Sequence, residues 1–480
     1  MEPRRSARLE ARRRQEEQAQ ANQPQPNAPP FHLVRIVQQV VEAPEDVDDG
    51  EAELDIQAEL DHFHVCLPFL SFVFRCFFPA IAHADSTSDP RWDLRKRKAL
   101  QDGLMKKPKW ESDPHRPSLE NLPSNILVYV FSMLSPRERL LVECVSRKLR
   151  RISMKSWSRQ THLDWTHFYG ATRYHRAEVM MFLKRAKRLN SLSLDSFRDA
   201  LDYSIARGIS CLCGPSLTTL VLRGVMATNS SLQQIGLGCP NLRCINLASC
   251  FKDSVIERGV GSMLSNLHHL EHLDVSMNER FEGYPSFKEL PPTITKLCLN
   301  YSYSLTGEAL LAMRERLPNL RQLEMNGVET IPANILSKVF SNFNSLESLS
   351  FRESQGDRNG SLIYELGEMP SLRDVYLDDN GYIGDMAIQS LCRGSAKSLS
   401  DLSFSNQYIS FDRRTFEQFA SFRRLESIEL SYMDRMRDED LLLVARLGTL
   451  RNVKLCQCPL ITGRSLCLLI TFNQSIQLGK

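Results

Sequence analysis

Cysteine and histidine are the side chains in this sequence that most readily support metal binding or nucleophilic catalysis. The chain has 13 cysteines and 11 histidines in 480 residues, and two pairs have Cys-x-Cys spacing, Cys211 with Cys213 and Cys456 with Cys458. No Cys-x-x-Cys pair accompanies another at zinc spacing. No nucleophile and base stand at a spacing typical of catalysis. We therefore predict a non-enzyme without metal or cofactor, whose cysteines stay reduced inside a cell.

Carboxylates form the second chemically suggestive group. Five acids and a tyrosine fall on positions expected to share one face of a sheet: Glu324, Asp374, Tyr376, Asp378, Asp401 and Glu429. In the same positions of this stretch the base is Arg352. Carboxylates pair well with arginine, and tyrosine is a frequent interface anchor. We predict that this patch receives a basic segment of a protein substrate; the alternative is a generic solvated surface.

These positions follow from an internal repeat, apolar-x-x-apolar-x-apolar, whose units begin 24 to 28 residues apart. Eleven units begin at Leu189, Leu217, Leu242, Leu270, Ile294, Leu320, Leu346, Leu372, Leu399, Leu425 and Leu450. The fourth and sixth residues of a unit point to the same side of a strand, and stacked neighbours bury that side together. The pattern and period resemble the leucine-rich repeat. The predicted fold class is an α/β solenoid with parallel strands on its concave face.

The segments between the strands refine this prediction. Residues 306–317 and 438–448 have helical patterns, whereas the proline-rich 281–292 is not expected to form a proper helix. Polar turn residues of the motif, expected to bond backbone groups, are Cys250, Asn278, Asn380 and Cys458. Residues 176–189 are predicted to cover the front of the solenoid, and Ile476 with Leu478 to form a truncated twelfth strand.

A separate helical region precedes the repeats. Its first predicted helix has a wide apolar stripe: Ile126, Leu127, Val130, Phe131 and Leu134. A second helix should start at Ser135 as N-cap with Pro136 and Glu138 behind it, and a third lies near 146–157. Three short helices in some 45 residues have too little core to be very stable alone. A partner is therefore expected to complete the stripe.

The stretch LENLPSNILVYVFSMLSPRERLLVECVSRKLRRI resembles an F-box, and HLDW at 162–165 resembles the Leu-Asp that often closes that module. Leu149 stands where the family usually has tryptophan. F-box followed by leucine-rich repeats is the arrangement of a known family, the substrate receptors of Skp–Cullin–F-box (SCF) ubiquitin ligases. The resemblance implies that the Skp adaptor contacts Leu122, Pro123, Ile126, Leu127, Val130, Phe131, Leu134 and Leu140.

The N-terminal quarter of the chain is predicted to contain no folded domain. We divide the chain into a disordered tail (1–60), an apolar segment with a basic linker (61–116), the F-box (117–165), a linker with a capping helix (166–188) and the repeats (189–480). Residues 63–82 approach the ~20 residues of a membrane helix, but Arg75, Pro68 and Pro79 favour a packed or partner-bound segment. The basic runs Arg95–Lys98 and Lys106–Lys109 suit nuclear import or a solvated linker equally.

The predicted function is that of a non-catalytic substrate-recognition subunit of an SCF-type ubiquitin-protein ligase. Its expected partners are a Skp-family adaptor, through it a cullin, and a protein substrate, with a membrane involved only through 63–82. A net charge of +3 with 24% charged residues gives no reason to expect nucleic acid. The expected location is cytoplasmic, nuclear or both. The alternative is a leucine-rich-repeat scaffold that recruits no ligase and serves as a nuclear or membrane tether.

Overall fold

The computed structural model describes residues 122–164 and 176–476, apart from 196, 198, 252–256, 329–330, 342, 354–360, 381–383, 406–410 and 474. The predicted tail, the apolar segment 63–82 and the basic runs therefore lie outside the described residues. The chain divides into two compact units, which are described separately: one contains 122–134 and 140–149, and the other contains 135–139 and the chain from 150 onward. Among the described residues, no helix is long and apolar enough to cross a membrane.

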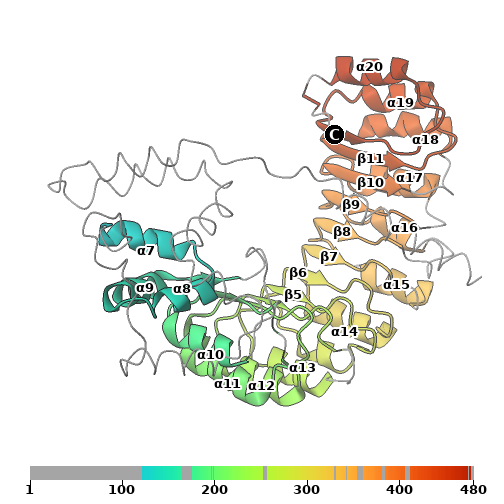
Figure 1. The fold of residues 1–480 in the computed structure, drawn as a ribbon. Helices are drawn as coiled ribbons and strands as arrows, with labels where there is room; N and C mark the ends of the chain where they lie inside the picture. Colours follow the sequence, from blue (N-terminus) through green and yellow to red (C-terminus); the bar gives the residue numbers. More distant parts are fainter. Residues whose placement is uncertain are drawn as a thin grey trace, which may run out of the picture. The chain divides into compact units, whose positions relative to one another are not determined.

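The three helices predicted ahead of the repeats are present: α7 (Ser124–Ser132), α8 (Pro136–Val142) and α9 (Arg147–Arg159) (Figure 1). The start of α8 is the predicted capping box. The Ser135 N–H donates to Glu138 Oε2 at 2.9 Å, and the Glu138 N–H donates to Ser135 Oγ at 3.3 Å. These reciprocal bonds satisfy backbone donors that the first turn of a helix leaves without partners.

Twelve parallel strands form one open sheet in which every strand pairs with its neighbours in chain order, so the predicted leucine-rich-repeat solenoid is confirmed. The first six strands are β1 (His162–Leu163), β2 (Ser191–Ser193), β3 (Thr219–Val221), β4 (Cys244–Asn246), β5 (His272–Asp274) and β6 (Lys296–Cys298). The last six are β7 (Gln322–Glu324), β8 (Ser348–Ser350), β9 (Asp374–Tyr376), β10 (Asp401–Ser405), β11 (Ser427–Ser431) and β12 (Asn452–Lys454).

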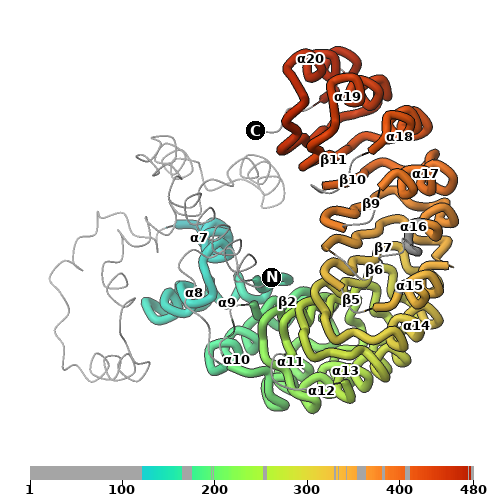
Figure 2. Tube along the Cα trace, turned by 90° about the vertical axis from the view of Figure 1, so that its right-hand side faces the viewer, coloured from blue at the N-terminus to red at the C-terminus, as the bar shows by residue number. Residues whose placement is uncertain are grey.

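Helices connect the strands and lie on the outer side of the arc that the repeats describe, while the strands line its inner side (Figure 2). Those of the first half are α10 (Arg176–Arg185), α11 (Tyr203–Leu212), α12 (Asn229–Gly238), α13 (Glu257–Leu264) and α14 (Gly307–Arg316). Those of the second half are α15 (Ala333–Phe340), α16 (Ser361–Leu366), α17 (Asp385–Gly394), α18 (Arg413–Gln418), α19 (Asp438–Ala445) and α20 (Gly463–Phe472). As predicted, 281–292 contains only a short 3₁₀ turn, η5 (Ser286–Glu289).

Both ends of the sheet differ from the prediction. Strand β1 adds a unit before the first predicted repeat, with His162 and Leu163 in register with Ser191 and Leu192. At the other end Ile476 lies in no strand, and Leu478 is outside the described residues. Among the described residues, the additional strand therefore stands at the front of the sheet.

The turn after each strand has a repeated backbone geometry. Seven non-glycine residues there adopt left-handed conformations with φ between 53° and 60°: Ser249, Met277, Tyr301, Glu353, Asp379, Tyr432 and Gln457. Each stands seven residues after the first apolar residue of its unit. The Met277 N–H donates to the Asn300 carbonyl of the next unit at 2.7 Å. A left-handed conformation is unfavourable for residues other than glycine. At these positions it allows the backbone N–H to bond the next unit, which extends the hydrogen-bond ladder beyond the strand.

One residue further on, the predicted side chains of Cys250, Asn278 and Asn380 are buried, whereas Cys458 is half-buried. Asn278 is 1% exposed; its Nδ2 donates to the carbonyls of Leu247 at 3.0 Å and Val275 at 2.6 Å, and its Oδ1 accepts from the Phe251 N–H at 2.9 Å. Cys250 donates its thiol hydrogen to the Leu222 carbonyl with 3.0 Å between Sγ and O. Burial raises the pKa of the Cys250 thiol to about 12, so this cysteine is structural and not a nucleophile.

Candidate protein-interaction surfaces

Four of the five acids predicted to receive substrate lie on strands β7, β9, β10 and β11 of one sheet, and Asp378 follows β9 by two residues. Asp374 and Asp401 are paired in register on β9 and β10, as are Tyr376 and Ser403. Glu429 on β11 follows next to Ser403, and Glu324 lies two strands before β9 on β7. The parallel register therefore brings together side chains that are separated by about one repeat in sequence.

Three of the five acids are neutralised by bases on the same face. Lys296 Nζ lies 3.1 Å from Glu324 Oε1, and Lys454 Nζ lies 2.7 Å from Glu429 Oε1. Lys296 lies on β6 and Lys454 on β12, so both lysines are outside the stretch from β7 to β11 in which the sequence shows more acids than bases. Burial opposes ionisation of Glu324, but hydrogen bonds from Asn300 and Lys296 lower the pKa of its carboxyl overall.

Asp378 is the third neutralised acid. Arg352 Nε lies 2.7 Å from Asp378 Oδ2, and Ser403 Oγ donates to Asp378 Oδ1 at 2.6 Å. The Arg352 guanidinium also stacks on the ring of Tyr376, with 4.8 Å between its central carbon and the ring centroid. Burial nevertheless raises the pKa of the Asp378 carboxyl, against the effects of Ser403 and Arg352.

Asp374 and Asp401 are the two acids of this surface that no ion pair balances among the described residues. Ser400 Oγ lies 3.2 Å from Asp374 Oδ1 and 2.9 Å from Asp401 Oδ2. Neither carboxylate has an ion pair within the part of the chain that the structure describes. Burial raises the pKa of the Asp374 carboxyl, and the neighbouring Asp401 adds to the rise. A basic group placed over this pair would relieve their repulsion, and Tyr376 provides an adjacent apolar surface.

The predicted adaptor-binding residues separate into two sets. Leu127, Phe131 and Leu134 are buried in the chain itself. Leu122, Ile126, Val130 and Leu140 are half-buried, and Pro123 is exposed. Leu149, which replaces the usual tryptophan, is only 2% exposed. This position is therefore filled, and the side chains accessible to a partner are those of the second set.

In the second unit, the first turn of α8 and the C-terminal part of α9 contact α10 through side chains. Arg137 forms a two-point ion pair with Glu178, with N–O distances of 2.7 and 2.9 Å. Arg139 is buried over the ring of Trp157, which stacks on Phe182 with 6.0 Å between centroids. Burial lowers the pKa of Arg139 to about 10. Trp157 of α9 thus packs on α10, which connects β1 to β2 in the first unit of the sheet. That 176–189 covers the front of the solenoid stays a prediction.

Comparison with known proteins identifies the helical region. Residues 119–162 match the F-box-like family model. The chain carries an F-box-like domain. The matched segment ends at His162, the first residue of β1, so the F-box-like domain runs directly into the sheet of leucine-rich repeats.

Relatives of the chain as a whole are distant. The Caenorhabditis elegans protein EEED8.10, a candidate RNA-binding protein by its name, is 23% identical over 385 residues, which are 73% of this chain and 51% of that protein. The chain therefore spans about half the length of this curated relative.

Two solved structures resemble the chain weakly. A chain of the yeast Rad7 and Elc1 complex is 18% identical, covers 79% of this chain and 96% of its own length, and has a TM-score of 0.40. An internalin (inlF) of Listeria monocytogenes is 17% identical, covers 76% of this chain and 100% of its own, and has a TM-score of 0.45.

Proposed function

We propose that this chain is the non-catalytic substrate-recognition subunit of an SCF-type ubiquitin-protein ligase. The F-box-like domain binds a Skp-family adaptor and through it a cullin, and the concave face of the repeats holds the protein to be ubiquitinated. The observation that supports this most is the direct joining of an F-box-like domain to a leucine-rich-repeat sheet in one chain. Such a subunit acts in the cytoplasm, the nucleus or both, and supplies no catalytic residue.

The adaptor is expected to cover the accessible apolar side chains of α7 and α8. Pro123, Ile126, Val130 and Leu140 present apolar surface without being part of the buried core. Burying a large apolar side chain contributes ~1.5–3 kcal/mol, and interface energy concentrates in a few such residues. Phe131 contributes differently, since it is 1% exposed in the chain alone and helps to hold the domain together.

Charged substitutions at the accessible positions test the proposal. Ile126→Asp and Val130→Asp place a carboxylate on the surface that the adaptor would cover, so each should lower recovery of the Skp adaptor and the cullin at least about tenfold in a quantitative co-purification from cells. Leu237→Asp, at an exposed position of α12, is the matched control and should leave recovery unchanged. Full recovery with both Ile126→Asp and Val130→Asp would contradict adaptor binding through α7.

On the concave face, Asp374 and Asp401 are the residues expected to receive a basic segment of the substrate, with Tyr376 beside them. Glu324, Asp378 and Glu429 belong to the proposed surface, but their charges are already balanced by Lys296, Arg352 and Lys454. The substrate therefore gains a charge-assisted contact mainly at the first pair, and the balanced residues contribute hydrogen-bonding surface around it.

A further inference from the structure

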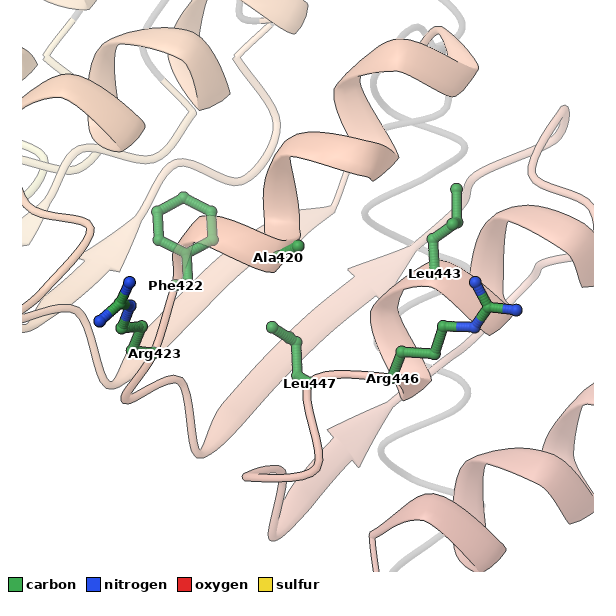
Figure 3. A pocket seen from close by; sticks show the side chains of 6 residues that line it. All are labelled: Ala420, Phe422, Arg423, Leu443, Arg446 and Leu447. Atoms are coloured by element: carbon green, nitrogen blue, oxygen red, sulfur yellow. The ribbon is translucent and has the colours of Figure 1, made fainter.

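A second surface lies away from the concave face, between the repeats that contain η6 (Phe419–Ser421) and α19. It is a hollow of about 260 Å³ lined by Ala420, Phe422, Arg423, Leu443, Arg446 and Leu447. Figure 3 shows Leu447 between two groups, Phe422 with Arg423 on one side and Leu443 with Arg446 on the other. Phe422 is buried, whereas Leu443 and Leu447 are half-buried and both arginines are exposed. The hollow is thus apolar with a cation at either side.

The charge around this hollow is not balanced. Among the described residues, the side chains of Arg423 and Arg446 have no ion pair and no hydrogen-bond partner. The same holds for two further exposed bases, Arg424 and Lys397, which also stand where the chain passes from a helix to the next strand. Arg451 differs, because it pairs with Glu426 at 3.4 Å. Of these bases, Arg423 and Arg446 line the hollow, so two positive charges without an ion pair flank it.

A segment of this same chain has the complementary pattern. Residues 36–74 contain no lysine or arginine, and within them stands AELDIQAELD, residues 52–61. It contains two Glu-Leu-Asp triplets, centred on Leu54 and Leu60. In each triplet one aliphatic side chain has a carboxylate on either side, which matches an apolar hollow with an arginine on either side.

We propose that residues 52–61 bind this hollow within the same molecule, with Leu54 or Leu60 against Leu443 and Leu447, and with the flanking carboxylates paired to Arg423 and Arg446. A nucleic acid fits less well, because single strands bind by stacking bases on accessible aromatic rings, and Phe422 is buried. The segment then competes with any external acidic segment for this surface, which makes the site self-regulated. The inference does not depend on adaptor binding.

The length of the connecting chain allows this contact. Sixty residues lie between Asp61 and Leu122, and at ~3.3–3.6 Å per residue they reach at most roughly 200 Å. Twelve strands spaced ~4.8 Å apart extend on the order of 50 Å along the sheet. A linker that reaches its site holds the segment at an effective concentration near the millimolar range, so even weak intrinsic affinity keeps the hollow occupied.

Binding of a labelled peptide of residues 50–63 to the full chain tests the proposal by fluorescence anisotropy. In one variant the attached segment is neutralised by isosteric changes: Glu53→Gln, Asp55→Asn, Glu59→Gln and Asp61→Asn. This variant should bind the peptide at least about tenfold more tightly than the unmodified chain, because its hollow is no longer occupied. Adding Arg423→Glu and Arg446→Glu should abolish the binding, whereas adding Arg207→Glu and Arg258→Glu, at exposed positions of α11 and α13, should not.

Four results would overturn the proposal. The first is equal affinity of the peptide for the neutralised and unmodified chains, and the second is binding that survives reversal of Arg423 and Arg446. The third is an affinity difference between the two chains that disappears when the protein is diluted, because the hollow would then be occupied by the segment of a second copy. Single-stranded RNA that binds in place of the peptide and requires the same arginines would count in the same way. Circular dichroism of each variant separates loss of binding from loss of folding.

Discussion

At the level of single residues, Asp374 and Asp401 differ from Glu324, Asp378 and Glu429 because they share Ser400 and, among the described residues, form no ion pair. A charge-assisted hydrogen bond contributes ~1.5–3 kcal/mol. Glu429 has Lys454 at 2.7 Å and gains less from a substrate cation. The specificity of the surface for a basic segment is therefore expected to come from this pair.

The first prediction at this scale concerns Asp374→Asn with Asp401→Asn. Binding of a labelled Arg-Lys-Arg peptide should fall roughly tenfold or more, by the charge-assisted contacts that are lost. Glu439→Gln removes an exposed acid on α19 and should leave the affinity unchanged. Titration of the peptide into the full chain measures both. Equal losses for the control and the double variant would show that general charge, and not this pair, attracts the peptide.

The same pair gives a pH dependence. Burial and Asp401 raise the pKa of the Asp374 carboxyl above its ordinary value, so Asp374 takes up a proton at a higher pH than an exposed aspartate does. Its charge is present above the raised pKa and is lost as the pH falls through it. Peptide affinity measured from pH 7 downward should therefore decline earlier than the titration of ordinary aspartates predicts. A flat profile through that range would contradict a role for Asp374.

The sequence predicted the positions of these residues better than their charge state. A strict repeat determines which side chains share a face, so Glu324, Asp374, Tyr376, Asp378, Asp401 and Glu429 were placed on one sheet surface from spacing alone. Pairing depends on neighbours one strand away. Lys296 and Lys454 therefore escaped an interpretation that considered only the acidic stretch. The separation of buried Leu127 from accessible Ile126 likewise needed the tertiary packing.

At the level of elements, the turn residues hold adjacent repeats together. Asn278 bonds backbone groups of its own unit and of the unit before it. Helix α8 shows a similar local determinant in its Ser135 and Glu138 capping box. Both were readable in the sequence because each depends on a few residues at fixed spacing. Strand β1 was not, since Gln160 stands where a repeat begins with an apolar residue, and Leu163 with Asp164 resembled the Leu-Asp that closes an F-box.

Asn278→Ala tests this element directly. The change leaves buried backbone groups without partners, each at ~1–3 kcal/mol, so the free energy of unfolding should fall by at least about 2 kcal/mol in urea denaturation. Asn452→Ala, at an exposed position of β12, should change it by less than about 0.5 kcal/mol. A similar small effect for both variants would mean that water replaces the Asn278 bonds and that the turn contributes little.

At the level of the whole molecule, the proposed function joins two binding surfaces in one chain. We propose that apolar side chains of α7 and α8 bind an adaptor and that the sheet binds a substrate. The described part of the chain contains no cluster of three or more histidine, cysteine, aspartate or glutamate side chains suited to a metal. In the proposed function, the chain contributes recognition and the chemistry is assigned to its partners.

The most direct test of the central claim is size-exclusion chromatography with light scattering on the purified full chain mixed with a purified Skp-family adaptor. We predict a stable complex of one chain with one adaptor at micromolar concentration, and loss of that complex with Ile126→Asp. The proposed role would be contradicted by a folded chain that elutes separately from every Skp-family adaptor tested. The protein concentrations should reach roughly 100 µM, where a complex with a dissociation constant of about 1 µM is almost fully formed.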